Sequence, residues 1–179
     1  IFDGEDISKL NDEKISKIRL KQMGFIFQHS YLLKNLSIRD NIVLPGFKLG
    51  KLSREQVNQN ADELMIKTGI DSVAGHDIKK VSGGQLQRAA ICRALINQPG
   101  LLILDEPNTF VDKVFEQDLY RWLGELNKKM AILLVSHDIG TISPMIKSIA
   151  CVNGNLHYHP SNQLSEEVLK VYNCPVDII

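Results

Sequence analysis

Two neighbouring acids, Asp105 and Glu106, have the best placement for chemistry in this sequence. They follow four apolar residues, 101–104, which predict a buried strand. The end of such a strand in a parallel sheet delivers side chains to the carboxyl edge, where ligands bind. Asp105 is therefore predicted to bind Mg²⁺, which prefers oxygen ligands, and Glu106 to act as a general base on a water molecule. The alternative is that Asp-Glu-Pro only ends a strand and opens a turn.

A phosphate site is predicted at Ser82-Gly83-Gly84-Gln85. Ser82 and Gln85 have the spacing of a capping box, which predicts a helix start. Glycines let backbone N–H groups approach an anion, and the helix start adds the positive end of its dipole. The alternative is an ordinary capped helix after a turn. The usual phosphate-binding loop, Gly-x-x-x-x-Gly-Lys-Ser/Thr, does not occur within residues 1–179.

These motifs resemble those of ABC transporter ATP-binding subunits. Ser82-Gly83-Gly84-Gln85 resembles the signature motif, with Val81 where Leu is commoner, and residues 101–106 resemble the Walker B strand. The resemblance covers essentially the whole chain. Residues 2–7 resemble the strand and turn that follow the phosphate-binding helix in this family, so we expect a family member without its N-terminal portion.

Three further residues take their predicted roles from this resemblance. Gln28, after Gly-Phe-Ile-Phe, resembles the Q-loop glutamine, whose amide oxygen would reach Mg²⁺ or the attacking water. His137, in Leu-Val-Ser-His-Asp, resembles the switch histidine and would hydrogen-bond the γ-phosphate. Asp112 resembles the D-loop aspartate that links two sites across a dimer, although the Phe-Val before it departs from the small residues usual there.

The resemblance also implies cofactors and partners. It implies ATP and Mg²⁺, a second ATP-binding subunit that the signature motif serves in trans, and a membrane permease, with no nucleic acid. It implies a cytoplasmic position on the inner face of the cell membrane. The helical insertion, including residues 31–46, is the expected permease-docking surface. Its segment just past Gln28 has more apolar residues than a free loop needs, so Leu32, Leu33 and Leu36 are predicted to contact the permease.

Two other functions compete with a transporter ATPase. The first is a non-catalytic fragment that only docks on a permease or partner subunit, and the missing phosphate-binding loop favours it for these 179 residues. The second is an ATPase head of chromosome maintenance or DNA repair. Such heads need long coiled-coil heptads, which this sequence does not contain.

The transported substrate is less clearly indicated because the two parts of the chain differ. Residues 24–46 and the signature helix resemble exporters of the lipoprotein-release and antimicrobial-peptide type. From Asn108 onward the sequence resembles zinc or manganese transporter ATPases. Either the chain joins segments of two subfamilies, or it represents a single divergent subfamily.

Composition agrees with a folded body. The chain has 179 residues, of which 44% are hydrophobic and 23% charged, with a net charge of +0. This balance argues against disorder and against a basic, non-specific nucleic-acid binder. The three cysteines are far apart in sequence and fit reduced thiols better than disulfides or a zinc site.

The predicted fold class is α/β: a P-loop-NTPase-like (ABC-type), mostly parallel sheet with a helical subdomain, incomplete at the N-terminus. The subdomain is expected at about residues 29–97 and a C-terminal tail at about 160–179. Helices are predicted at 11–20, 36–44, 53–68, 83–97, 113–128 and 165–172, with Pro45-Gly46 stopping the second. Strands are predicted at 24–27, 101–104, 131–135, 148–152 and 156–159. The strands at 101–104 and 131–135 are expected to be covered on both faces because they are wholly apolar.

Overall fold

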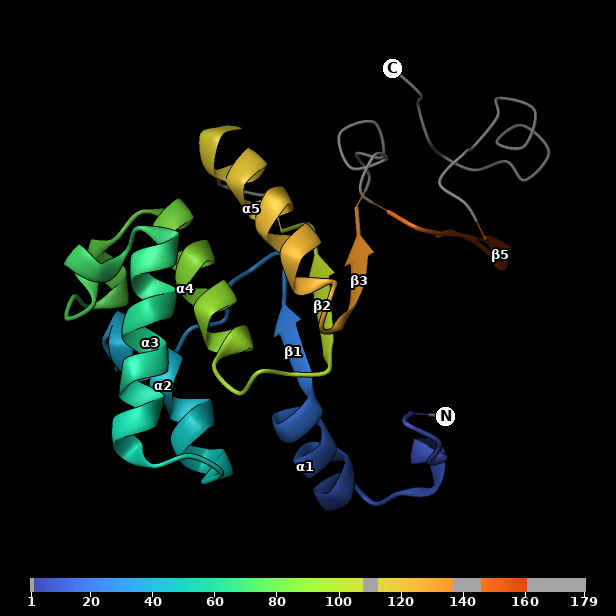
Figure 1. Cartoon of the computed structure of the whole chain (residues 1–179), viewed down its shortest axis with the longest axis horizontal. Helices are drawn as coiled ribbons and strands as arrows, with labels where there is room; N and C mark the ends of the chain where they lie inside the picture. Colours follow the sequence, from blue (N-terminus) through green and yellow to red (C-terminus); the bar gives the residue numbers. More distant parts are fainter. Residues whose placement is uncertain (1, 108–112, 137–145, 161–179) are drawn as a thin grey trace.

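The structure is a computed structural model, and it describes residues 2–107, 113–136 and 146–160 (Figure 1). The predicted helix at 165–172 and most of the predicted C-terminal tail lie outside the described residues. In chain order the elements are η1 (Ile7–Lys9), α1 (Asp12–Gln22), β1 (Met23–Ile26), α2 (Ile38–Leu49), α3 (Arg54–Thr68), η2 (Asp71–Val73), η3 (Ile78–Lys80), α4 (Gly83–Leu95), β2 (Leu101–Asp105), α5 (Lys113–Leu126), β3 (Ala131–Val135), β4 (Ile149–Asn153) and β5 (Asn155–His159).

A parallel sheet with the strand order β1-β2-β3 forms the centre of the described fold. Ile26 of β1 pairs with Leu104 of β2, and Asp105 pairs with Val135 of β3, so all three strands end at one edge. Helices α2, α3 and α4 lie between β1 and β2 in sequence, and α5 lies between β2 and β3. The strands β4 and β5 form a separate antiparallel hairpin, with Gly154 at a φ of +70° in its turn. The predicted α/β class is confirmed.

Local sequence signals set the ends of the helices in the first half of the chain. The side chains of Ser53 and Gln56 form the predicted capping box of α3, and Gly69 ends this helix at a φ of +67°. Ser82 and Gln85 form the second capping box, at the start of α4. Helix α4 ends at Leu95, two residues before its predicted end.

The prediction that Pro45-Gly46 stops the second helix is wrong. Helix α2 continues to Leu49 and ends at Gly50, which has a φ of +64°. Pro45 lacks an N–H and gives up one helical hydrogen bond, but packing offsets this loss. Gly46 lies so close to α3 that a Cβ atom there would be 2.7 Å from Cγ1 of Val57. Packing of α2 against α3 therefore stabilises the helix beyond Pro45.

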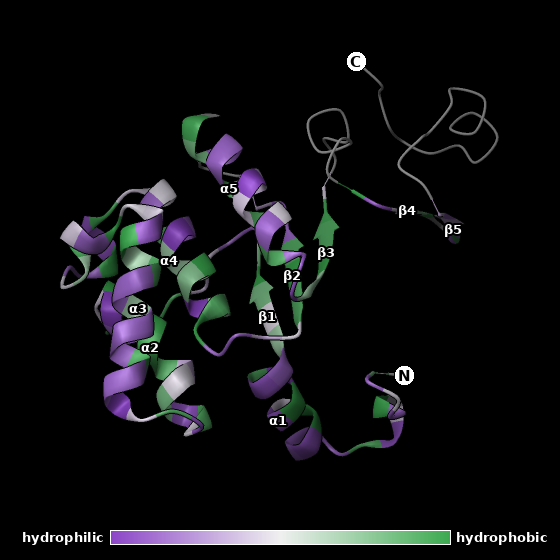
Figure 2. Ribbon diagram, in the orientation of Figure 1, coloured by the Kyte–Doolittle hydropathy of each residue, from purple (hydrophilic) through white to green (hydrophobic). Residues whose placement is uncertain are grey.

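Two apolar clusters form the interior, and α4 contributes to both. The helical core lies between α2, α3 and α4, and its buried residues are Leu32, Ile38, Ile42, Val43, Val57, Ala61, Met65, Ile70, Ala89, Cys92 and Ile96. The sheet core lies where α4 and α5 cover the sheet, and its buried residues are Ile26, Ile91, Leu95, Leu102, Leu104, Phe115, Leu119, Tyr120 and Leu123. Figure 2 shows the hydrophobic colouring of the three strands beside the mixed surfaces of the helices. Helix α4 therefore packs against both clusters and lies between the helical core and the sheet core.

The prediction that both apolar strands are covered on both faces fails for β3. Alternate residues of β3 are exposed, with Leu133 at 52% and Val135 at 48% of their full accessible surface. Their neighbours Ile132 and Leu134 pack against the sheet core. Within the described residues, helices cover only one face of β3, so apolar sequence alone does not decide how a strand is buried.

Candidate functional site

The predicted acids occupy a tight turn at the carboxyl end of β2. Asp105 is the last residue of the strand, and both acids are half-buried. Glu106 has a φ of +46°, a conformation that non-glycine residues rarely adopt and that is unusual before a proline. Its N–H donates to the carbonyl oxygen of Val135 at 3.0 Å, which fixes the turn to the end of β3. The following residue, Pro107, is buried.

Gln28 reaches the same edge of the sheet. It lies two residues beyond Ile26, whose partner Leu104 immediately precedes Asp105, so the register brings Gln28 to the edge where the acids lie. The Gln28 side chain is exposed. The segment that follows is anchored by Arg93 of α4, whose guanidinium donates to the carbonyl oxygens of Ser30 at 2.9 Å and Tyr31 at 2.8 Å.

The side chains of residues 31–36, which follow Gln28, differ in exposure. Tyr31 is 67% exposed and Leu33 46% exposed, whereas Leu32 is only 8% exposed and belongs to the helical core. Leu36 is half-buried. The prediction that Leu32 is a surface contact for docking is therefore wrong, because its side chain fills the core behind this surface.

The predicted phosphate site forms the N-terminus of α4. The Ser82 hydroxyl accepts a hydrogen bond from the Gln85 N–H at 3.2 Å, and the Gln85 side-chain oxygen accepts one from the Ser82 N–H at 2.9 Å. By the geometry of a helix start, the N–H groups of Gly83 and Gly84 have no intrahelical partner and can bind an anion. The first turn of α4 contains no acidic side chain that would repel a phosphate.

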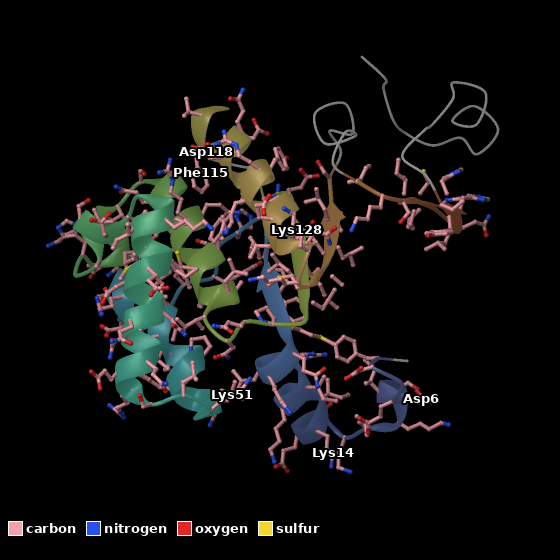
Figure 3. The ribbon with its side chains drawn as sticks, in the orientation of Figure 1. Asp6, Lys14, Lys51, Phe115, Asp118 and Lys128 are labelled. Atoms are coloured by element: carbon pink, nitrogen blue, oxygen red, sulfur yellow. The ribbon has the colours of Figure 1, made fainter. Side chains whose placement is uncertain are left out.

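The first half of α4 is held between α3 and α5. Arg88 donates to the carbonyl oxygen of Thr68 at 3.2 Å, and its guanidinium carbon lies 4.0 Å from the ring centroid of Phe115. Phe115 lies near the start of α5 (Figure 3). These contacts anchor the N-terminal half of α4 to the end of α3 and the start of α5.

The structure thus brings Asp105, Glu106 and Gln28 to one edge. Asp112 and His137 lie outside the described residues. In the described part of the chain, no group of three or more His, Cys, Asp or Glu residues is arranged to hold a metal ion. Asp105 and Gln28 together offer one carboxylate and one amide oxygen, which fits Mg²⁺, since this ion usually binds one or two protein carboxylates and takes its remaining ligands from water and substrate phosphates.

Sequence reasoning missed two residues that organise this edge. Arg93 anchors the segment after Gln28, and Gln87 of α4 donates to the carbonyl oxygen of Pro107 at 3.3 Å. Gln87 is only 2% exposed. A polar residue on the buried face of α4 was the available signal, because such a group needs a hydrogen-bond partner.

No helix within the described residues is long and apolar enough to span a bilayer. The family model described as "ABC transporter" matches residues 1–109. Among curated proteins, the chain is similar to the "Lipoprotein-releasing system ATP-binding protein LolD" of Wigglesworthia glossinidia brevipalpis, with 34% identity over 158 residues that cover 87% of this chain and 69% of the relative. The protein of the same name from Bacteroides thetaiotaomicron is 31% identical over 157 residues, which cover 87% of this chain and 72% of the relative.

Solved structures similar to this chain are also ATP-binding cassettes. A dimeric post-hydrolysis state of the ATP-binding cassette MJ0796, bound to ADP and Pi, matches with a TM-score of 0.83 and 28% identity, covering 92% of this chain and 73% of that one. A second dimeric structure of MJ0796, a bacterial ABC transporter cassette, matches with a TM-score of 0.73 and 31% identity, covering 79% of this chain and 62% of that one. The resemblance of the C-terminal part to zinc or manganese transporter ATPases remains a prediction. The fold, the motifs and these relatives together place the chain in the ABC transporter family, as part of an ATP-binding subunit.

Proposed function

We propose that this chain provides the catalytic acids, the signature segment and the permease-docking surface of an ABC transporter that moves lipoproteins. The observation that carries the catalytic part is the turn of Asp105 and Glu106 at the carboxyl edge, fixed by the hydrogen bond from Glu106 to Val135. The lipoprotein substrate is supported by relatives named as lipoprotein-releasing proteins, at 34% and 31% identity.

The proposed reaction is ATP hydrolysis. The Glu106 carboxylate accepts a proton from a water molecule while the water oxygen forms a bond to the γ-phosphorus. The bond from that phosphorus to the β–γ bridging oxygen breaks, and ADP and phosphate leave. Asp105 and Gln28 would hold Mg²⁺, which when bound neutralises charge on the phosphates. His137 would donate a hydrogen bond to the γ-phosphate.

Two copies of the cassette would act together. Ser82, Gly83 and Gly84, capped by Gln85, would close over the nucleotide held by a second ATP-binding subunit, using the unpaired N–H groups at the start of α4. Asp112 would link the two sites across the dimer. The dimeric state of the similar MJ0796 structures supports this arrangement.

The docking surface would be the exposed part of residues 31–46. Tyr31 and Leu33 carry the apolar exposed area, and Arg93 fixes the backbone beneath them. We propose that residues 29–97 form a helical subdomain around the helical core, and that 160–179 form a C-terminal tail. Docking on a permease would hold the subunit on the cytoplasmic side of the cell membrane.

We also propose that the 179 residues on their own are inactive and bind ATP–Mg²⁺ only in the millimolar range or more weakly, equivalent to about −4 kcal/mol. They contain no phosphate-binding loop, so the lysine and N–H groups that hold the β- and γ-phosphates are not supplied by these residues. Acids alone cannot attract a tetra-anion. Isothermal titration measures this affinity, and micromolar binding with Mg²⁺-dependent phosphate release would contradict the proposal.

A reconstituted transporter tests the proposed substrate. The full-length protein and its permease are placed in proteoliposomes, and ATP-dependent transfer of a fluorescent lipoprotein to a soluble acceptor is measured. We expect transfer with the wild-type protein and none with Glu106→Gln. ATP-dependent transport of radioactive zinc or manganese, without lipoprotein transfer, would contradict the lipoprotein proposal and favour the other resemblance.

A further inference from the structure

Gln87 is an unusual residue for its position in α4. Its neighbours on the buried side of the helix include Ala90 and Ile91, yet Gln87 carries a polar amide and is only 2% exposed. Burying an amide without a hydrogen bond is unfavourable, so this side chain needs a partner. The structure supplies a partner that is not part of any helix or strand, the carbonyl oxygen of Pro107.

The hydrogen bond from Gln87 has a defined direction. A proline carbonyl can only accept, so the amide nitrogen of Gln87 must face Pro107, and the two atoms lie 3.3 Å apart. Pro107 directly follows Glu106 and is itself buried. A side chain from α4 thus holds the backbone one residue beyond the proposed base.

The turn that Gln87 holds is strained. Glu106 has a φ of +46° and precedes a proline, a combination that is unfavourable and persists only where surrounding contacts enforce it. Two hydrogen bonds do so, one from β3 and one from α4. Val135 of β3 accepts the Glu106 N–H at 3.0 Å, and Gln87 donates to the next carbonyl group.

We propose that Gln87 is a positioning residue for Glu106: it keeps the strained turn in the geometry in which the Glu106 carboxylate reaches the attacking water. This inference rests on the proposed role of Glu106 as the base. Gln87 lies one helical turn after Gly83, on the helix that begins with the phosphate site. The phosphate-binding end of α4 and the base therefore move as one unit.

The test compares Gln87→Met with wild type in the full-length protein assembled with its permease. Methionine keeps the length and approximate volume of glutamine but removes the donor. Because a positioned base contributes about 10²–10⁴ in rate, we expect turnover to fall about tenfold to a hundredfold, while KM for ATP changes less than twofold. Turnover within threefold of wild type would overturn the inference.

Thr68→Val is the matched control. The hydroxyl of Thr68, the last residue of α3, is buried and lies 3.3 Å from Sγ of Cys92 in α4, away from the acid turn. Like Gln87→Met, Thr68→Val removes one buried polar contact made with α4. The turnover of Thr68→Val is expected to stay within twofold of wild type. If Thr68→Val lowers turnover as much as Gln87→Met, the effect is general loosening of α4 and the inference is wrong.

A double variant separates this inference from the proposed function. With Glu106→Gln, the base is absent, so adding Gln87→Met is expected to lower the residual turnover less than twofold. A further tenfold loss would show that Gln87 acts elsewhere. If Glu106→Gln alone keeps turnover within threefold, the proposed role of Glu106 fails first. If it abolishes turnover but Gln87→Met has no effect, only the positioning role fails.

Gln87→Glu keeps the test decisive if the methionine variant does not fold. A buried carboxyl group has a raised pKa and can donate to Pro107 only when protonated. Turnover of this variant is expected to rise at least threefold between pH 8 and pH 6. The wild-type enzyme has no ionisable group at position 87, so it is expected to show no such rise. Parallel pH profiles for the two proteins would contradict the inference.

Discussion

The N–H of Glu106 donates to the carbonyl oxygen of Val135 at 3.0 Å, one residue beyond the last β2–β3 pair, Asp105 and Val135. This contact places the turn with the proposed base against the end of β3, two residues before His137 in sequence. It also holds Glu106 at its positive φ. The acid turn is therefore tied to the end of the sheet, in addition to its contact with Gln87 of α4.

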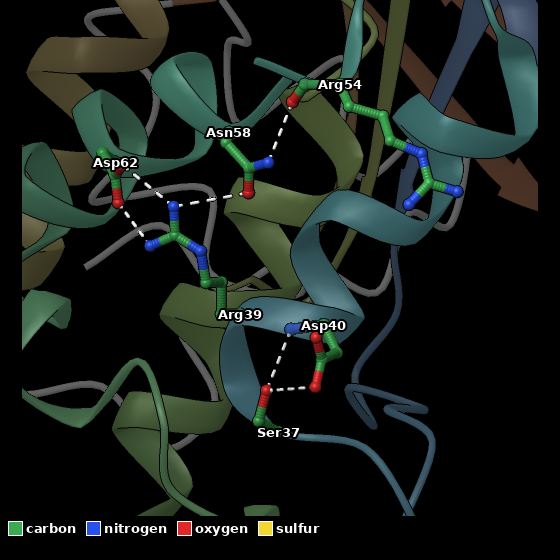
Figure 4. A network of polar contacts seen from close by, with 6 residues as sticks. All are labelled: Ser37, Arg39, Asp40, Arg54, Asn58 and Asp62. Atoms are coloured by element: carbon green, nitrogen blue, oxygen red, sulfur yellow. Dashed lines mark hydrogen bonds and ion pairs between the residues drawn. The ribbon is translucent and has the colours of Figure 1, made fainter. Parts of the chain in front are cut away.

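The ion pair between Arg39 of α2 and Asp62 of α3 predicts a pH-dependent stability. Nη1 and Nη2 of Arg39 donate to the two carboxylate oxygens of Asp62, at 2.5 and 2.9 Å, and Nη2 also donates to the side-chain oxygen of Asn58 (Figure 4). The hydrogen bond from Arg39 lowers the pKa of Asp62. Since the Asp62 side chain is 50% exposed, solvent screening limits the expected loss for Asp62→Asn to about 0.5–1 kcal/mol at pH 7.

The sign of this pH effect follows from the lowered pKa. The contribution is fully present above the unfolded-state pKa of Asp62, near pH 4, and is lost as pH falls through the lower folded-state pKa. Urea unfolding of wild type and Asp62→Asn is therefore expected to differ at pH 7 and to converge at acidic pH, once the folded-state carboxyl group of Asp62 is protonated. Lys17→Met, which removes the exposed Lys17–Glu13 pair, is the control, with a smaller expected change. A constant difference between wild type and Asp62→Asn down to pH 2 would rule out this origin.

Gly46→Ala is expected to destabilise the helical core. The new methyl group would lie 2.7 Å from Cγ1 of Val57, a side chain too short to move aside. Overpacking of this kind costs about 1–3 kcal/mol, partly offset by up to about 1 kcal/mol from the better helix propensity of alanine. Thermal unfolding measures the balance. Gly75→Ala is the control, since a Cβ atom there meets no atom within 4 Å. Equal melting temperatures for the two variants would refute the close contact.

The sequence predicts those features of this fold that depend on neighbouring residues. Both capping boxes, Ser53 with Gln56 and Ser82 with Gln85, form as predicted because they span three residues. The passage of α2 through Pro45 could not be predicted, because it depends on packing against α3. The contact between Gln87 and Pro107 joins residues 20 apart in sequence, so local patterns did not identify it. The edge that gathers Asp105, Glu106 and Gln28 was predictable from parallel strands alone.

Charge on the exposed docking surface is expected to weaken permease binding without unfolding the subunit. Leu33→Asp changes a side chain that is 46% exposed, so the melting temperature should stay within about 2 °C of wild type. Recovery of the full-length protein with its permease should fall severalfold in co-purification. Leu32→Asp, in the helical core, is expected instead to unfold the subunit. Full recovery of the complex with Leu33→Asp would place the docking surface elsewhere.

Glu106→Gln is the decisive variant for the proposed role of Glu106 as the base of an ABC-type ATPase. In the full-length protein with its permease, ATP affinity and steady-state hydrolysis are measured on the same preparation, with Glu116→Gln of α5 as the matched control. The amide keeps the shape of the turn but cannot accept the proton. We predict unchanged ATP affinity and a loss of turnover of at least a hundredfold for Glu106→Gln, with turnover near wild type for the control. Turnover of Glu106→Gln within threefold of wild type would show that Glu106 is not the base.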